Sequence, residues 1–265
     1  MRDDRVKNLL TLGSEIAGAA VGGAVGFFAA GPAGAAGAGV LGVAAAKLLQ
    51  DVSGRSLSRR EEIRIGAAAA FAIDYIRHRL EAGERPRTDG FFTEQQAGIS
   101  AAEEIFDGVL VTAKSDHEEQ KARYYGRLFA NVSFDPHCSR HEANYLLHVM
   151  DSTTFLQLVL LSIFRDTSRF HLRSARYKPG EVISFDLLTI LSATFTLFQA
   201  GLLRLHEAGA QHGEIVLEMN QLRPAFISLT ASATRLYQMA GLADIGYEHF
   251  TPVVAALSVS SNPKA

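Results

Sequence analysis

The chain has no tryptophan and only one cysteine, and its 26 basic and 28 acidic residues nearly balance. A single cysteine, Cys138, cannot form an internal disulfide, so nothing in the sequence indicates an oxidising compartment. A net charge of −2 argues against a protein that coats nucleic acid non-specifically, although it leaves room for a local basic patch. We therefore expect a cytoplasmic main body.

Catalytic signatures are also missing. The sequence contains no phosphate loop of the P-loop type, no His-Glu-x-x-His and no Gly-x-Ser-x-Gly. His137-Cys138-x-x-His141 superficially offers metal ligands, but a tetrahedral site needs a matched second pair, which is not visible. A helix that Ser139 caps after the Asp135-Pro136 break explains the same residues. The sequence predicts no enzyme, no cofactor and no metal site, and a soluble enzyme would need a pocket that the sequence does not flag.

Charge is absent from one long segment. Residues 16–46, thirty-one in all, carry no charge, and nine of them are glycine. Glycine costs about 1 kcal/mol relative to alanine in a helix interior, which favours a membrane setting where small residues let helix backbones touch. The candidates for helix packing in the membrane are Gly18, Gly22, Gly26, Gly34 and Gly42, the first three at Gly-x-x-x-Gly spacing.

As one helix this segment would be about 46 Å long, against a hydrocarbon core of about 30 Å. The sequence therefore predicts a tight transmembrane hairpin over residues 1–52 that turns at Gly31-Pro32. Basic residues on both flanks suit two cytosolic ends and predict the bacterial inner membrane. Glu15 and Lys47 bracket the hairpin as pore-mouth candidates or plain interfacial anchors. A single span, a re-entrant pair, a soluble hairpin, a linker and a signal peptide stay open.

Ser-x-x-Glu capping boxes divide residues 53–150 into a helical connector domain. They are Ser58/Glu61, Ser100/Glu103, Ser115/Glu118 and Ser139/Glu142. The first predicts a helix through the Ala-rich stretch 67–72 to a charged end near residue 81. Around Ser115, apolar spacing predicts two antiparallel helices that bury Leu110, Val111, Tyr125, Leu128, Phe129 and Val132. Glu118, Glu119, Lys121 and Arg123 are expected on the solvated side.

Residues 151–265 show the order of a winged-helix-like α+β domain. We expect an apolar helix over 155–164, a second apolar stretch over 182–205, a strand over 214–219 and a helix that begins at Thr230 and ends at Gly241. Segments 202–205 and 215–218 would form the wing hairpin. The alternative for residues 187–203, seventeen residues without charge, is a further membrane span.

Between the apolar stretches, residues 165–178 carry five positive charges and one negative charge, with aromatic residues interleaved. Such a mixture can hold phosphates while stacking bases. The candidates for binding a polyanion are Arg165, Arg169, Arg173, Arg176, Tyr177 and Lys178. A solvated loop is the alternative. If the hairpin assembles several subunits, one modest patch on each becomes a ring that binds a polyanion multivalently.

Three segments, 124–131 (YYGRLFAN), 142–147 (EANYLL) and 155–161 (FLQLVLL), resemble poorly characterised bacterial proteins related to the abortive-infection alpha group. The resemblance covers about residues 100–240 and carries no site residues. It implies a bacterial helical domain linked in some cases to phage defence. With its Gly-rich segment, the chain is also similar to membrane effectors of bacterial antiviral systems, in which a cytosolic sensing domain gates a small channel.

These patterns together predict a mainly α-helical, homo-oligomeric membrane effector, a gated pore of antiphage defence. Its cytosolic domain would bind a nucleotide, an oligonucleotide or a partner protein of the defence operon. The alternative is a membrane-tethered, DNA- or protein-binding winged-helix module without pore activity. Membrane lipid and further copies of the same chain are the other expected partners.

Overall fold

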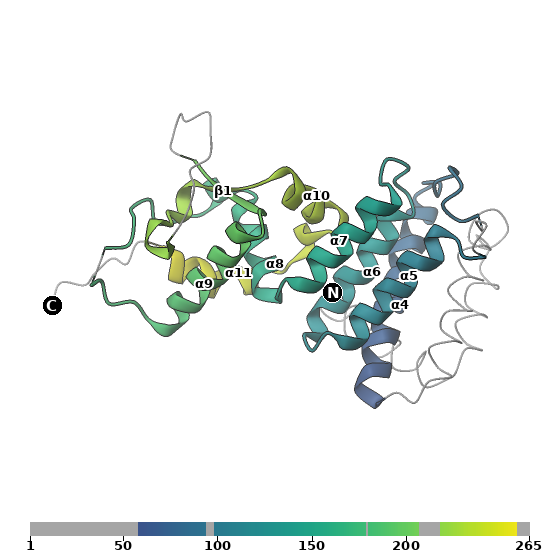
Figure 1. Ribbon diagram of the computed structural model, residues 1–265, viewed down its shortest axis with the longest axis horizontal. Coiled ribbons are helices and arrows are strands. Elements are labelled where there is room, and N and C mark those ends of the chain that lie inside the picture. The colour runs from purple at the N-terminus through teal and green to yellow at the C-terminus, as the bar shows by residue number, and fades with distance from the viewer. Residues whose placement is uncertain (1–57, 94–97, 179, 207–217, 259–265) are drawn as a thin grey trace. The chain divides into compact units, whose positions relative to one another are not determined.

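The computed structural model of the 265-residue chain describes residues 58–93, 98–178, 180–206 and 218–258 (Figure 1). The predicted transmembrane hairpin, with Gly18, Gly22, Gly26, Gly34, Gly42, Glu15 and Lys47, lies outside the described residues. The described chain is mainly helical and divides into two compact units, with the boundary between Ser152 and Thr153. Each unit has its own core.

The first unit contains four α-helices in its described part. They are α4 (Arg59–Glu81), α5 (Ala101–Ser115), α6 (Ala122–Val132) and α7 (Arg140–Ser152), and the 3-10 helix η1 (Glu119–Lys121) precedes α6. The predicted helix through the Ala-rich stretch is α4, and it packs mainly against α6. At their crossing a Cβ on Gly126 would lie 2.5 Å from the Ala68 carbonyl oxygen. The buried alanines and this glycine thus let two helix backbones approach closely.

Two of the predicted capping boxes are confirmed in full. Ser58 pairs reciprocally with Glu61, and Ser100 pairs reciprocally with Glu103. Ser139 accepts the backbone N–H of Glu142 at 3.1 Å at the start of α7.

The prediction for Ser115 is wrong, because Ser115 is the last residue of α5. Its hydroxyl donates back to the Val111 and Thr112 carbonyls. The hydrogen bond that Ser115 was expected to accept from the Glu118 N–H is accepted instead by the Asp116 carboxylate, at 2.9 Å.

Two burial predictions around this turn are also wrong. Val111 is 47% exposed, because it follows the buried Leu110 by about 100° around α5. Lys121 was expected in solvent, yet it is only 1% exposed. The η1 turn places Lys121 directly before α6, on the side that faces the core.

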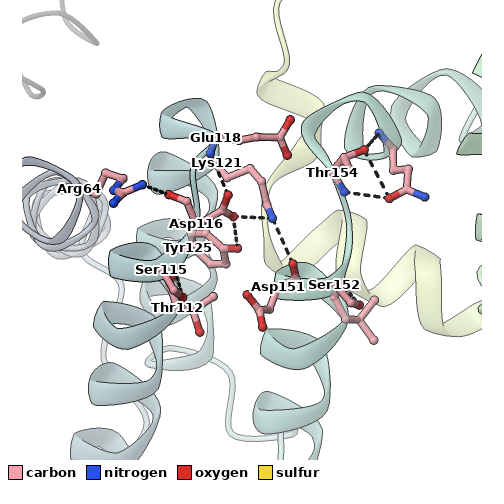
Figure 2. Close-up of polar contacts among 12 residues, drawn as sticks. Arg64, Thr112, Ser115, Asp116, Glu118, Lys121, Tyr125, Asp151, Ser152 and Thr154 are labelled. Atoms are coloured by element: carbon pink, nitrogen blue, oxygen red, sulfur yellow. Dashed lines mark hydrogen bonds and ion pairs between the residues drawn. The ribbon is translucent and has the colours of Figure 1, made fainter. Parts of the chain in front are cut away.

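Lys121 lies at the centre of a buried polar cluster (Figure 2). Its ammonium is 2.6 Å from Oδ2 of Asp116 and donates to the Asp151 carbonyl at 3.4 Å. The Tyr125 hydroxyl donates to the same Asp116 oxygen at 2.7 Å. From α4, Arg64 donates to the Asp116 carbonyl at 2.5 Å. The cluster therefore joins α4, the turn after α5, α6 and the end of α7.

The charges in this cluster stabilise one another. Burial by itself would raise the pKa of the Asp116 carboxyl, but hydrogen bonds from Lys121, Tyr125 and the Glu118 N–H outweigh it and hold that pKa below its ordinary value. Burial and the neighbouring Asp116 carboxylate raise the pKa of Tyr125, so its hydroxyl stays a donor. Asp116 is thus ionised and compensated inside the unit.

The second unit is built around the apolar helix α8 (Phe155–Phe164), which has the predicted bounds. Thr154 caps it in a reciprocal pair with Gln157 (Figure 2). Around α8 lie α9 (Phe185–Gln199), α10 (Ala231–Met239), α11 (Tyr247–Leu257) and the strand β2 (Ile227–Leu229). The 3-10 helices are η2 (Thr167–Arg169), η3 (Met219–Gln221), η4 (Pro224–Phe226) and η5 (Leu242–Asp244).

The small sheet contains a pairing that the sequence did not predict. Strand β1 (Leu203–Leu205) lies in the predicted place, but its described partner is β2, antiparallel, with Leu203 opposite Leu229 and Leu205 opposite Ile227. Of the expected partner 215–218, only Glu218 is described. It is the residue before η3, which begins at Met219, so the predicted strand does not include Met219. The predicted start of α10 at Thr230 is confirmed, and Gly241 follows its end with a left-handed φ of 65°.

The alternative prediction, a membrane span over residues 187–203, does not match one continuous helix. Helix α9 ends at Gln199, Gly201 adopts a φ of 69°, and Leu203 already belongs to β1. In the described part of the chain no single helix combines the length and the apolar composition that crossing a membrane requires. The consecutive helices α7 and α8 have that length and apolar composition only when they are taken together as a bent pair.

Candidate ligand-binding site

The predicted basic segment, residues 165–178, belongs to the second unit and is fixed by its backbone. Leu172 forms a bridge with Ser258 near the end of α11, and the Arg173 N–H donates to the Leu257 carbonyl at 2.9 Å. The Arg173 carbonyl accepts the Ala225 N–H, and the Tyr177 N–H donates to the Asn220 carbonyl at 3.1 Å. The segment is therefore tied to α11, to η4 and to η3.

Arg173 was predicted to bind a polyanion, but its guanidinium is already engaged. It forms a bidentate pair with Glu181, at 2.5 Å from Nη1 to Oε1 and 2.9 Å from Nη2 to Oε2. It also donates to the carbonyls of Ala175 and Arg176. The hydrogen bond from Arg173 holds the pKa of the Glu181 carboxyl below its ordinary value. Arg173 thus links Ala175, Arg176 and Glu181 to one another.

Tyr177, another candidate for binding a polyanion, has a buried ring. Its side chain is only 7% exposed, and the Arg173 guanidinium covers the ring at 4.3 Å from the centroid. Burial raises the pKa of Tyr177, so the phenol stays protonated. Its hydroxyl is buried and has no hydrogen-bond partner among the described residues. The ring and the hydroxyl are therefore both covered, and the hydroxyl is a buried donor without a described acceptor.

The other predicted cations are exposed. Arg165, Arg169, Arg176 and Lys178 all lie at the surface of the second unit. Arg165 lies 5.9 Å from the Tyr237 ring centroid, and Arg169 lies 5.8 Å from that of Phe170. Lys178 lies close enough to Glu181 that its charge helps to lower the pKa of that carboxyl, and its backbone N–H donates to Oε2 of Glu181 at 2.9 Å. Four of the five predicted cations can therefore attract an anion at the surface.

A pocket of about 190 Å³ adjoins the end of this segment. Its apolar walls are Ile183, Leu188, Leu191 and Met219, and its polar lining is Tyr177, Lys178, Glu181 and Asn220. Sequence reasoning identified only Tyr177 and Lys178 among these residues. The others come from α9, from the turn before it and from η3, and only folding brings these segments together. No local spacing could have revealed the pocket.

The potential metal ligands named from the sequence form no cluster in the described residues. In residues 58–93, 98–178, 180–206 and 218–258, no three His, Cys, Asp or Glu side chains lie where they could hold a metal ion together. His137 and His141 are exposed, whereas Cys138 is fully buried. The Cys138 carbonyl accepts a hydrogen bond from the buried Arg87 at 2.7 Å. The motif at 137–141 thus forms a turn and a helix start.

Comparison with known proteins identifies no family for this chain. The chain matches no protein-family model, no curated protein and no solved structure. The resemblance to the abortive-infection alpha group stays a prediction from the sequence. Function has to be inferred from the residues and contacts described above.

Proposed function

We propose that this chain is a homo-oligomeric membrane effector of bacterial antiphage defence. Its residues 1–52 insert into the inner membrane and form or gate a pore, and its C-terminal unit binds a polyanion that controls it. The single observation that carries this proposal is the composition of residues 16–46, which have no charge and nine glycines. That composition suits close helix packing in lipid.

Oligomerisation follows from the arrangement of these glycines. Gly18, Gly22 and Gly26 recur every four residues, so they share one helix face and let a second helix approach. Lining a pore requires several such helices, because one hairpin encloses no lumen. Leakage through the assembled pore would dissipate the membrane potential and stop growth.

Control by a polyanion rests on the exposed cations of the second unit. Arg165, Arg169, Arg176 and Lys178 are exposed on each subunit. A weak contact at one subunit becomes strong when a ligand bridges several subunits, because each further contact is intramolecular. Binding of this kind falls steeply with salt, since each phosphate contact releases counterions.

Fractionation tests the membrane part of the proposal. Cells expressing the full chain, or a version without residues 1–52, are fractionated, and the membranes are washed with alkaline carbonate. Only the full chain should stay in the membrane, and its detergent extract should run as an oligomer. If both versions are soluble, the membrane proposal is wrong.

A matched pair of glycine variants tests the packing face. Gly22→Leu should reduce the oligomer, because it fills the shared face, whereas Gly23→Leu lies about 100° away around the helix and should leave the oligomer intact. Induction of the full chain should also collapse the membrane potential. Retention in the membrane without such a collapse would support the tethered module without a pore.

A further inference from the structure

The Tyr177 hydroxyl is the starting point. The side chain lines the pocket, is more than nine-tenths buried and finds no hydrogen-bond acceptor among the described residues. Buried phenol hydroxyls normally have a partner, because an unpaired buried donor is costly. The neighbouring guanidinium of Arg173 offers only donors. Its oxygen is enclosed in the free protein, so an acceptor supplied by a ligand would satisfy this group only after the pocket wall moves aside.

The apolar walls and the volume of the pocket limit the size and shape of a ligand that could bind there. Four aliphatic or thioether side chains, Ile183, Leu188, Leu191 and Met219, form its apolar lining. Its volume of about 190 Å³ lies below the range of about 300–1,000 Å³ that is usual for drug-sized ligands. A single flat ring system fits such a space, with its faces against apolar walls and its edge toward the polar lining.

The charged side chains at the rim of the pocket determine which ligand charge it favours. Glu181 would repel an anion, but the bidentate pair with Arg173 compensates its charge. Lys178 is exposed and lines the pocket, and its charge together with that of Arg173 outweighs the single carboxylate of Glu181. Asn220 adds a side-chain amide to the lining. The rim therefore favours an anionic group next to the ring.

We propose that this pocket takes one nucleobase, with the adjoining phosphate at Lys178 and a ring acceptor on the Tyr177 hydroxyl. A nucleotide combines a flat ring, acceptors on the ring edge and a phosphate in one molecule, and so does the terminal base of a single strand. The inference rests on the proposed function and deepens it, because it names the polyanion as a nucleotide or a single-stranded nucleic acid.

Matched ligands test the base. Binding of nucleoside 5′-monophosphates to the full chain in detergent is compared with that of ribose 5-phosphate, and binding of single-stranded hexanucleotides with that of an abasic hexamer of the same charge. The ligand with bases should bind at least about tenfold more tightly in one of the two pairs. The pair that responds identifies the source as a free nucleotide or a strand.

Tyr177→Phe tests the hydroxyl. It should weaken binding of the responding ligand about three- to tenfold, the loss expected for one neutral hydrogen bond. It should leave binding of the base-free ligand unchanged. The melting temperature should stay the same or rise slightly, because the hydroxyl has no protein partner to lose. A fall in melting temperature with unchanged ligand affinity would mean a purely structural hydroxyl and would overturn the assignment.

The Met219 methyl group gives a direct readout. With methyl-labelled methionine, a base in the pocket should shift the Met219 resonance by its ring current, whereas the buried Met150 of the first unit should not respond. Equal binding of base-containing and base-free ligands with a silent Met219 would overturn the base pocket and leave the polyanion proposal standing. Absence of binding by every one of these ligands would overturn both.

Discussion

Replacing Lys121 with methionine should destabilise the first unit far more than the loss of a surface charge would. Lys121 is 1% exposed, and the side chain of its partner Asp116 is 7% exposed, so the substitution leaves a buried carboxylate without its cation. Removing one member of a buried pair typically costs about 3–5 kcal/mol. Tyr125 and the Glu118 N–H still donate to Asp116, which places the expected loss near 3 kcal/mol.

Lys114→Met is the matched control, since it removes another lysine close by in the sequence. Lys114 is 3.8 Å from Glu61 in an ion pair whose lysine side chain is 36% exposed. Such surface pairs are worth about 0–1 kcal/mol. The free energies of unfolding of the three proteins, measured by chemical denaturation under one set of conditions, give the comparison. Equal losses for both variants would refute the reasoning.

The pH dependence gives a second check on the same cluster. The pKa of Asp116 is lowered in the folded protein, so its ionised form contributes stability above its ordinary value of 3.8. This contribution disappears as the pH falls from about 3.8 through the lower folded pKa. The difference between the parent and Lys121→Met should therefore shrink below pH 4. A difference that stays constant from pH 7 to pH 3 would contradict a charge-based role for Lys121.

Four further variants, in two matched pairs, concern packing (Gly126 and Gly108) and helix caps (Ser100 and Ser115). Gly126→Ala should destabilise the first unit by at least about 1 kcal/mol, because its Cβ would meet the α4 backbone at 2.5 and 2.7 Å. Gly108→Ala should lie within about 1 kcal/mol of zero, because its Cβ meets only the end of the Leu147 side chain, at 2.8 Å, and alanine favours the helix. Ser100→Ala should cost about 0.5–2 kcal/mol by removing a cap, and Ser115→Ala less than about 0.5 kcal/mol. The free energies of unfolding of all four variants, measured by chemical denaturation, test these expectations. Equal losses within either pair of variants would contradict the assigned contacts.

The helix starts could be predicted because their signals are local. Ser58, Ser100 and Ser139 each accept an N–H from the third residue after them, and Thr230 begins α10 in the same way. The bounds of α8 follow equally from its apolar run. Ser115 shows the limit of this reasoning, since the same spacing occurs where the chain leaves a helix and Asp116 provides the competing acceptor.

The candidate site was predicted only in part. The exposed cations of residues 165–178 follow from composition, whereas the engagement of Arg173 depends on Glu181 and on two carbonyls fixed by the turn. The place of Tyr177 depends on η3, about forty residues further along the chain, because the Tyr177 N–H donates to the Asn220 carbonyl there. A pattern read over one window contains neither contact.

The sequence by itself determined the helical class of the described chain, the caps that begin most of its helices and the uncharged segment that motivates the membrane proposal, because these depend on neighbours within a few residues. Tertiary structure alone decided that Lys121 is buried, that β1 pairs with β2 and that a pocket opens beside Tyr177. Each of these joins segments that are distant in the chain, and their burial outweighs the local preference of a lysine or a tyrosine for the surface.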